Sequence, residues 1–269
     1  MDGKLAILGT GRMGEALLGG LLRSQWATPD QVWCTVHTPD RAQHLADTYG
    51  VRADTDSPAA AADADVVIIA VKPQNMRSLL EDISSAVRPG QTVISVAAGV
   101  PTSTIESVLS DGVAVVRVMS NVPVLVDEAM SVIAPGRHAG AEHVEIAERI
   151  LGHVGRVVHL GEEHLDSVTA LSGSGPAYFF LLAEAMIDAG ILLGLSRDIA
   201  TELIIQTMVG SAKMLRDTGR HPVELRESVT SPGGTTIAAI RVLEEERVRA
   251  AFLNAIEAAK RRSEELAGA

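Results

Sequence analysis

The stretch Lys4-Leu5-Ala6-Ile7-Leu8-Gly9-Thr10-Gly11-Arg12-Met13-Gly14 decides the fold. Its apolar first half is typical of a buried strand, and the pattern G-x-G-x-x-G follows directly. In that pattern the first glycine permits a tight turn and the second lets the backbone approach a pyrophosphate. The third lets the next helix pack against the strand, and the free N–H groups of that helix suit an anion. All six residues Gly9–Gly14 are therefore candidate cofactor-binding residues; the alternative is an ordinary glycine turn.

Strands and helices alternate through the first 160 residues. Further strands are expected over 32–36, 65–71, 92–97, 113–119, 130–134 and 156–160, with helical patterns before and between them. The run Val66-Val67-Ile68-Ile69 is continuously apolar, which is typical of a parallel strand covered on both faces. Such alternation predicts right-handed crossovers and a mostly parallel sheet.

After Gly161 no strand pattern follows, and the apolar residues recur with a helical period. Helices are expected over 163–171, 176–193, 197–218, 222–229, 235–245 and 246–266. We therefore predict an α/β protein with two domains. Residues 1–160 form a Rossmann-type dinucleotide-binding domain with a mostly parallel sheet, and residues 161–269 form an all-helical domain.

Composition narrows the function class. The chain has 269 residues, a formal net charge of −11 and 21% charged residues, which disfavours nucleic acid as a partner. A single cysteine, Cys34, excludes a disulfide framework and a multi-cysteine metal site, and it fits a reducing compartment. The first residues do not resemble a secretory signal. We expect a cytoplasmic protein that binds small molecules and holds no metal.

The helix expected from Ala177 to Ser196 is the most apolar part of the chain. Glu184 and Asp188 lie near its middle, and two carboxylates there are costly in lipid, so we interpret it as a buried helix and not as a membrane span. It is apolar nearly all round and needs cover on every side. About a hundred residues of helical domain can scarcely supply that cover, which predicts an intertwined homodimer.

The loop after the second strand indicates which nucleotide is preferred. It reads Val36-His37-Thr38-Pro39-Asp40-Arg41 and lacks an acidic residue at the position where an NAD site binds the ribose 2′-hydroxyl. Thr38 can donate a hydrogen bond to a 2′-phosphate, and His37 and Arg41 can add positive charge. We predict NADP(H) as the preferred cofactor, with NAD(H) possible; the alternative for Arg41 is a solvated surface side chain.

Two further loops follow strands at the edge where open α/β sheets bind ligands. Ala70-Val71-Lys72-Pro73 ends one strand and Ala97-Ala98-Gly99 ends the next, where small side chains leave space for a flat ring. These seven residues complete the cofactor-binding prediction. The alternatives are a surface lysine at Lys72 and small residues that only ease packing.

Two glycine-rich segments open helices in the second half, Ser172-Gly173-Ser174-Gly175-Pro176 and Ser231-Pro232-Gly233-Gly234-Thr235-Thr236. Ordinary capping needs one serine or threonine. Glycines at a helix start let a ligand touch the backbone, and N–H groups with hydroxyls suit a carboxylate. A generous helix cap is the alternative. Nothing resembles a Ser–His–Asp arrangement, which hydride transfer does not require.

The chain resembles the pyrroline-5-carboxylate reductase family over essentially its whole length. The resemblance rests on Leu171–Tyr178, Asp188-Ala189-Gly190 and Ser231–Ile237, with support from Ala70–Gln74 and from Arg117-Val118-Met119 with Asn121 and Pro123. It implies NAD(P)H-dependent reduction of 1-pyrroline-5-carboxylate, a cyclic imino acid, to L-proline in the last step of proline biosynthesis. It also implies a helical dimerisation domain, dimers that assemble into rings, and sites shared between the two chains of a dimer.

The resemblance also implies residue roles. Ser231, Gly234, Thr235 and Thr236 would bind the substrate, and Thr236 would be the catalytic residue that orients or protonates the imine. Ser120 and Val122 depart from the family pattern Met-Pro-Asn-Thr-Pro, and Ser57 replaces a frequent asparagine. Alternatives are a reductase of another small cyclic imine, a β-hydroxyacid dehydrogenase, or a non-catalytic NADPH-binding regulator; the absence of lysine from 163 to 194 disfavours the dehydrogenase.

Overall fold

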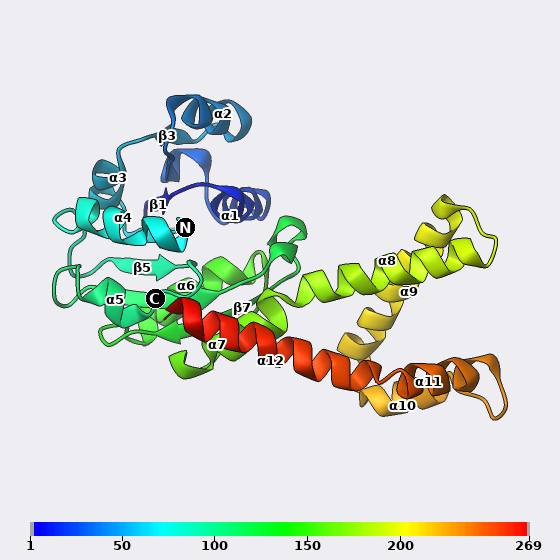
Figure 1. The fold of residues 1–269 in the computed structure, drawn as a ribbon. Helices are drawn as coiled ribbons and strands as arrows, with labels where there is room; N and C mark the ends of the chain where they lie inside the picture. The colour runs from blue at the N-terminus through cyan, green and yellow to red at the C-terminus, as the bar shows by residue number, and fades with distance from the viewer. Residues whose placement is uncertain (1–2, 268–269) are drawn as a thin grey trace. The chain divides into compact units, whose positions relative to one another are not determined.

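The computed structural model describes residues 3–267 (Figure 1). Its contacts divide the chain into two compact units. The sheet unit contains the residues up to Ser174 and those from Ala259 onward, and the helical unit is Gly175–Ala258. The functional division predicted from the sequence, 1–160 and 161–269, stays a prediction.

The sheet unit is built on eight strands in the order β3-β2-β1-β4-β5-β6-β7-β8. The strands are β1 (Leu5–Leu8), β2 (Val32–Thr35), β3 (Arg52–Asp54), β4 (Val66–Ile69), β5 (Thr92–Ser95), β6 (Ala114–Met119), β7 (Ala129–Pro135) and β8 (Gly155–His159). Among the described residues the pairing of β6 with β7 is the only antiparallel one, so β7 and β8 run opposite to the other six strands. The predicted mostly parallel sheet is confirmed. The sequence analysis missed β3, a three-residue edge strand too short to show a periodic pattern.

The strand order reverses at β1, which pairs with β2 on one side and β4 on the other. The crossovers after β1 and β3 therefore leave the sheet in opposite directions. This is the arrangement in which open α/β sheets leave a crevice beyond the carboxyl ends of their strands. Gly9 follows β1 there, and Ala70 follows β4.

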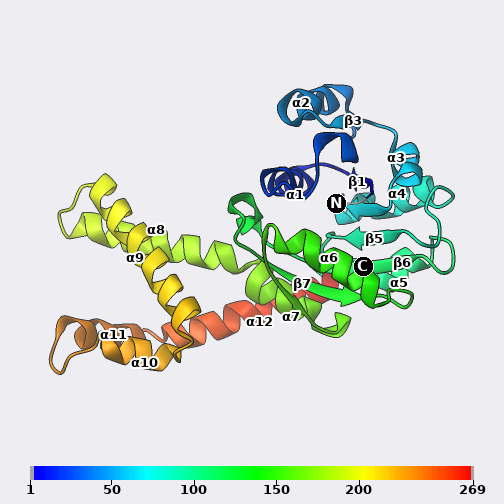
Figure 2. The same cartoon turned by 180° about the vertical axis from the view of Figure 1, so that it is seen from behind.

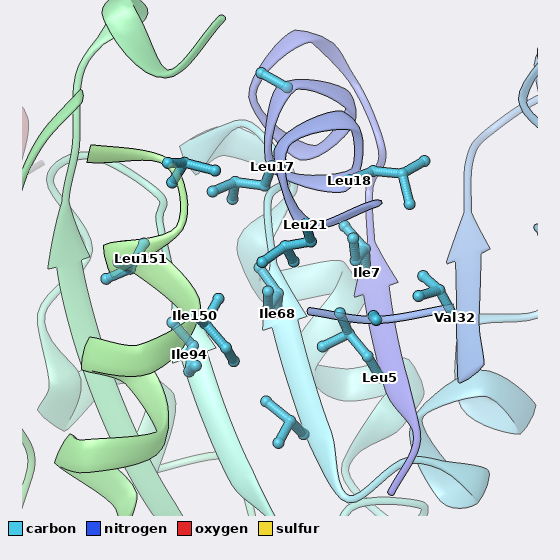
Figure 3. Packing of buried hydrophobic residues seen from close by; sticks show 14 of the residues in the cluster. Leu5, Ile7, Leu17, Leu18, Leu21, Val32, Ile68, Ile94, Ile150 and Leu151 are labelled. Carbon is cyan, nitrogen blue, oxygen red and sulfur yellow. The ribbon is translucent and has the colours of Figure 1, made fainter. Parts of the chain in front are cut away.

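Helices cover both faces of the sheet. They are α1 (Arg12–Arg23), α2 (Pro39–Tyr49), α3 (Ser57–Asp63), α4 (Met76–Ile83), α5 (Thr102–Glu106) and α6 (Ala141–Gly152). Leucines of α1, spaced one helical turn apart, pack with Ile150 and Leu151 of α6 onto one face (Figure 3). Side chains of α3, α4 and α5 form a second cluster on the other face. The unit thus completes its own core.

A three-part helical segment follows the sheet: a 3₁₀ turn (Glu162–His164), α7 (Leu165–Val168) and a π-helical stretch (Thr169–Gly173). The Glu162 carboxylate accepts hydrogen bonds from the Thr102 N–H at 2.8 Å, the Thr102 hydroxyl at 2.6 Å and the Arg117 guanidinium at 2.9 Å. Burial raises the pKa of this carboxyl, but those hydrogen bonds outweigh burial and hold the pKa below its ordinary value. Arg117 is almost completely buried, so Glu162 neutralises a charge inside the sheet unit.

The helical unit consists of α8 (Gly175–Leu192), α9 (Arg197–Thr218), α10 (Pro222–Ser228), α11 (Thr235–Glu245) and the first part of α12 (Val248–Ala267). Both views show α9 crossing α8 obliquely after a short turn and running on toward α10 (Figure 2). The two helices approach closely at Gly190, where an added Cβ would lie 2.8 Å from the Cβ of Ala200. This contact requires a glycine.

The helix α8 is not buried within its own chain. Phe179, Phe180 and Leu181 are each more than 60% exposed, and Gly175 is the only buried residue of α8. A single chain therefore does not cover this helix, as the sequence analysis expected of a helix that is apolar nearly all round. The segment Glu162–Leu192 is also long and apolar enough to cross a membrane by length and composition, and one such helix is weak evidence for a membrane span.

Candidate active site

In the glycine turn at the carboxyl end of β1, packing within the chain restricts Gly9 and Gly14, whereas the space beside Gly11 is open. Gly9 has φ +80°, and a Cβ there would collide with Val71. Gly14 packs against Ile7 and Ala70. At Gly11, by contrast, a Cβ would meet only the Gly9 carbonyl oxygen, at 3.9 Å. The protein itself thus does not require glycine at Gly11, which fits a position where a ligand approaches the backbone.

The start of α1 is free to hold an anion. Gly11 is its N-cap residue and supplies no side-chain cap, so no side chain satisfies the first N–H groups of the helix. Such N–H groups, at the positive end of the helix dipole, bind phosphate. These features fit the pyrophosphate of a dinucleotide.

A cavity of about 290 Å³ brings most of the predicted cofactor residues together at this turn. Its lining combines the glycine turn, the loop after β2 and the loop after β4: Gly9, Thr10, Gly11, Val36, His37, Thr38, Arg41, Ala70, Val71, Lys72 and Asn75. Three of these side chains are basic or can become so, and none is acidic. The cavity fits a ligand with several phosphates.

The loop after β2 leaves its polar groups available. Thr38 is the N-cap residue of α2, yet its side chain makes no capping hydrogen bond. Asp40 lies in the first turn of α2, as expected of a residue that begins a helix. Arg41 forms an ion pair with Glu15 of α1. A hydroxyl at the N-cap residue of α2 and a guanidinium in its first turn thus lie close together in the chain, although the guanidinium already has a partner.

Several predicted residues lie apart from this cavity. Met13 packs against the core, and Arg12 lines a separate cavity on the other side of α1, beside Arg23 and Tyr49. Pro73 begins the 3₁₀ turn after β4. Ala97, Ala98 and Gly99 follow β5, next to β4 in the sheet, so they share its carboxyl edge. Their cofactor role stays a prediction.

An adjoining cavity of about 330 Å³ contains residues that the sequence analysis did not select. Among them are Ser57, whose hydroxyl lies 2.8 Å from that of Thr35, and Asn75, whose amide lies 3.4 Å from the Nε2 atom of His37. Asn75 lines both cavities. Its position directly after Lys72-Pro73-Gln74 was the available signal, since the same strand end carries the whole segment.

The second predicted anion-binding turn lies in the helical unit at the start of α11. Gly233 has φ +69°, and the Gly234 N–H donates to the Ser231 carbonyl at 3.1 Å, which closes the turn. Gly234 is the N-cap residue and again supplies no side-chain cap. The hydroxyls of Ser231, Thr235 and Thr236 make no hydrogen bond to another residue in the described part of the chain. A small carboxylate suits this turn, and its role stays a prediction.

The other glycine-rich segment, Ser172–Pro176, is tied to the sheet unit. The Asn121 amide donates to the Ser172 carbonyl at 3.0 Å, while its oxygen accepts from the Met130 N–H at 2.9 Å. A Cβ at Gly173 would collide with the end of Met119. Ser172 and Gly173 thus already contact residues of the sheet unit, so this segment offers weaker evidence for a ligand than the turn at Ser231.

The single thiol takes no part in either turn. Cys34 lies in β2 and is fully buried, and burial raises the pKa of its thiol to about 12. Among residues 3–267, no three His, Cys, Asp or Glu side chains are placed to share a metal ion. The chemistry available to these sites is anion binding and hydrogen bonding.

Comparison with known proteins identifies the chain. It is 43% identical over 263 residues to the pyrroline-5-carboxylate reductase of Methanosarcina acetivorans, an alignment that covers 98% of this chain and 97% of the relative. The chain belongs to the pyrroline-5-carboxylate reductase family. Residues 162–266 match the family description pyrroline-5-carboxylate reductase dimerisation, and residues 4–99 match NADP oxidoreductase, coenzyme F420-dependent.

Solved structures of pyrroline-5-carboxylate reductases share this fold. The enzyme from Coxiella burnetii superposes with a TM-score of 0.93 at 35% identity and covers 99% of both chains. The enzyme from Plasmodium falciparum, solved with NADP bound, gives a TM-score of 0.90 at 27% identity and covers 99% of this chain and 98% of its own. The resemblance found in the sequence, and the predicted α/β fold followed by helices, are both confirmed.

Proposed function

We propose that the protein is an NADPH-dependent reductase that converts 1-pyrroline-5-carboxylate to L-proline, the last step of proline biosynthesis. The observation that carries this proposal is the 43% identity to a pyrroline-5-carboxylate reductase over 98% of the chain. The phosphate-compatible cavity at the carboxyl edge of the sheet supports it. The reaction adds a hydride from the cofactor to the carbon of a C=N bond and a proton to its nitrogen, and the proton comes from solvent water through the Thr236 hydroxyl.

NADPH fits the sheet unit, because the turn leaves space at Gly11 and the cavity of about 290 Å³ at this turn is lined by His37, Arg41 and Lys72 and by no carboxylate. When bound, the cofactor supplies the hydride through C4 of its nicotinamide. In this proposal Gly9–Gly14 hold the pyrophosphate, and His37, Thr38 and Arg41 hold the 2′-phosphate. Ala70–Pro73 and Ala97–Gly99 line the rest of the cofactor site, and NADH is accepted more weakly.

The turn at the start of α11 binds the substrate in this proposal. Ser231 and the backbone at Gly234 and Thr235 bind its carboxylate, since N–H groups at a helix start favour an anion. Thr236 donates a hydrogen bond to the imine nitrogen and so orients the C=N bond and stabilises the charge that develops there. No other acid or base from the chain is required.

The functional unit is a homodimer. The match to a dimerisation domain and the exposed apolar surface of α8 both support it. Glu184 and Asp188 on that helix favour an interface with a second copy over lipid. We further propose that dimers assemble into a ring, that the enzyme is cytoplasmic, and that residues 1–160 and 161–269 are its cofactor-binding and dimerisation domains.

One assay tests the activity against its rivals. The purified protein is mixed with NADPH and either pyrroline-5-carboxylate, other cyclic imines or β-keto acids, and NADPH oxidation is followed by absorbance. Rapid turnover with pyrroline-5-carboxylate and formation of proline are expected. Preference for another imine, preference for a keto acid, or NADPH binding without turnover would each contradict the proposal and favour the corresponding alternative.

A further inference from the structure

The contact between α1 and the first turn of α2 suggests how this chain chooses between NADPH and NADH. Arg41 lines the cavity at the glycine turn, and its Nη2 atom donates to Oε2 of Glu15 at 2.5 Å. Glu15 does not line that cavity; it borders the separate cavity beside Tyr49, whose hydroxyl lies 3.4 Å from the other Glu15 oxygen. The Glu15 carboxylate therefore binds Arg41 from outside the cavity that is predicted to hold the 2′-phosphate.

The guanidinium has donors to spare but only one charge. It carries five N–H groups, and Glu15 is the one hydrogen-bond acceptor that Arg41 reaches among residues 3–267. A phosphate monoester carries about 1.5 to 2 negative charges at neutral pH and binds guanidinium groups through two parallel hydrogen bonds. The Glu15 carboxylate and the 2′-phosphate thus compete for the same Arg41 guanidinium.

Both side chains of the pair are partly buried, at 33% exposure for Arg41 and 25% for Glu15. Solvent therefore screens the pair less than it screens a fully exposed pair. NADH has no 2′-phosphate and gains nothing when Arg41 leaves Glu15, whereas NADPH must share or displace that contact. Weakening of the Glu15–Arg41 contact therefore reduces the binding free energy of NADPH and not that of NADH.

We propose that Glu15 sets the preference between NADPH and NADH by competing with the 2′-phosphate for Arg41. The inference rests on the proposed function, since it assumes that the cavity binds a nicotinamide dinucleotide. It assigns a specificity role to a residue in the first turn of α1, 26 residues before Arg41 in the chain.

The test is a double-mutant cycle on cofactor binding. Glu15→Gln keeps the shape of the side chain and removes its charge, so the ratio of the NADH to the NADPH dissociation constant should rise by about two- to tenfold, the range of a partly exposed ion pair. In an Arg41→Met background the same Glu15→Gln change should leave the ratio unaltered. Dissociation constants are measured by calorimetry with each cofactor alone, without substrate.

A matched control removes a second ion pair of α1, one that does not involve Arg41. Arg23 donates to Asp127 at 2.7 Å, and neither residue lines the cavity at the glycine turn. Asp127 has φ +59°, a conformation that asparagine adopts well, so Asp127→Asn changes the charge by the same amount without added strain. It should leave the ratio of dissociation constants unchanged. Melting temperatures of all variants show whether each is folded.

The outcomes separate the mechanisms. A lower ratio in Glu15→Gln would mean that Glu15 orients Arg41 toward the phosphate, and it would overturn the competition. Equal tightening for both cofactors, persisting in the Arg41→Met background, would mean simple repulsion of the pyrophosphate and would also overturn it. If the unaltered protein bound neither cofactor, the proposed function itself would fail; if it bound both and Glu15→Gln left the ratio unchanged, only this inference would fail.

Discussion

The helices α1 and α8 show how differently the two units of this chain are stabilised. In α1 three of the four leucines, Leu17, Leu18 and Leu21, are completely buried against the sheet and Leu22 is partly buried, while Arg12 and Arg23 remain exposed. In α8 the apolar residues surround the whole helix, and only Gly175 is buried. The sheet unit therefore builds its core from its own residues, whereas the helical unit presents apolar surface that one chain does not cover.

The two predicted binding turns follow the same division. Gly9–Gly14 is anchored between strands whose side chains are buried, so its geometry is set within the chain. Ser231–Thr236 begins α11, a helix with no buried residue in the single chain. Cofactor binding should thus survive in an isolated subunit, whereas substrate binding should depend on the dimer.

The largest effect is expected where α8 meets a second copy. Phe180→Glu removes an apolar ring from each of two chains, and the lost burial alone corresponds to about 3–6 kcal/mol per dimer, or a hundredfold or more in the dimer dissociation constant. Light scattering should give the mass of a monomer at micromolar concentration. Val126→Glu is the control, because Val126 is equally exposed but belongs to the sheet unit, and its variant should stay dimeric. If the Phe180→Glu protein stayed dimeric, the exposed apolar surface of α8 would not be the surface that binds the second copy.

Thr236→Ala should separate chemistry from cofactor binding. The turnover number should fall by about tenfold to a thousandfold, the range for one positioned hydrogen-bond donor, while the NADPH dissociation constant stays unchanged. Steady-state kinetics and calorimetry measure the two quantities. Thr207→Ala serves as control, since the Thr207 hydroxyl only donates to the Leu203 carbonyl within α9. Unaltered turnover in Thr236→Ala would remove this residue from the mechanism.

Substitution of Glu162, in the 3₁₀ turn after β8, tests whether this segment stabilises the sheet unit. The pKa of its carboxyl is lowered in the folded protein, so its contribution to the free energy of unfolding is present at neutral pH and is lost as the pH falls through that lowered value. Glu162→Gln should reduce the free energy of unfolding by about 1–3 kcal/mol at pH 7 and flatten its decrease in acid. Urea unfolding at pH 7 and at stepwise lower pH measures both. Parallel pH profiles for variant and parent would show that Glu162 does not stabilise the unit.

The smallest effect on stability should come from Gly11. Gly11→Ala should raise the NADPH dissociation constant by about tenfold or more, since one lost charge-assisted contact corresponds to at least about 1.5 kcal/mol, and should leave the melting temperature unchanged. Gly9→Ala should lower the melting temperature as well, because that position has φ +80° and no space beside Val71. Tight NADPH binding by folded Gly11→Ala would mean that no ligand approaches this backbone.

The sequence predicted those features that depend on residues near one another in the chain. Gly9, Gly11 and Gly14 encode a turn, and Val66–Ile69 encodes a buried strand, because backbone conformation and burial follow from a few adjacent residues. The apolar composition of α8 also predicted, correctly, that one chain does not suffice to cover it. Its exposure in the single chain follows from the same composition.

Contacts between residues far apart in the chain could not be predicted from patterns of adjacent residues. Arg41 meets Glu15 across 26 residues, and Arg117 meets Glu162 across 45, because the sheet brings their elements together. An arginine that looks free in the sequence is therefore partly neutralised in the fold. Asn75 lies directly after the predicted segment Ala70–Pro73 and Gln74, but its approach to His37 across 38 residues depends on the strand order.

The position of Cys34 has a practical consequence for studying this enzyme. The only thiol of the chain lies inside β2 and stays protonated up to strongly alkaline pH, so maleimide or disulfide reagents should not modify the folded protein. The natural sequence thus behaves as a cysteine-free background. A single cysteine introduced on α8 or beside Ser231 would carry a fluorophore or spin label at one known place, and subunit exchange could be followed without altering Cys34.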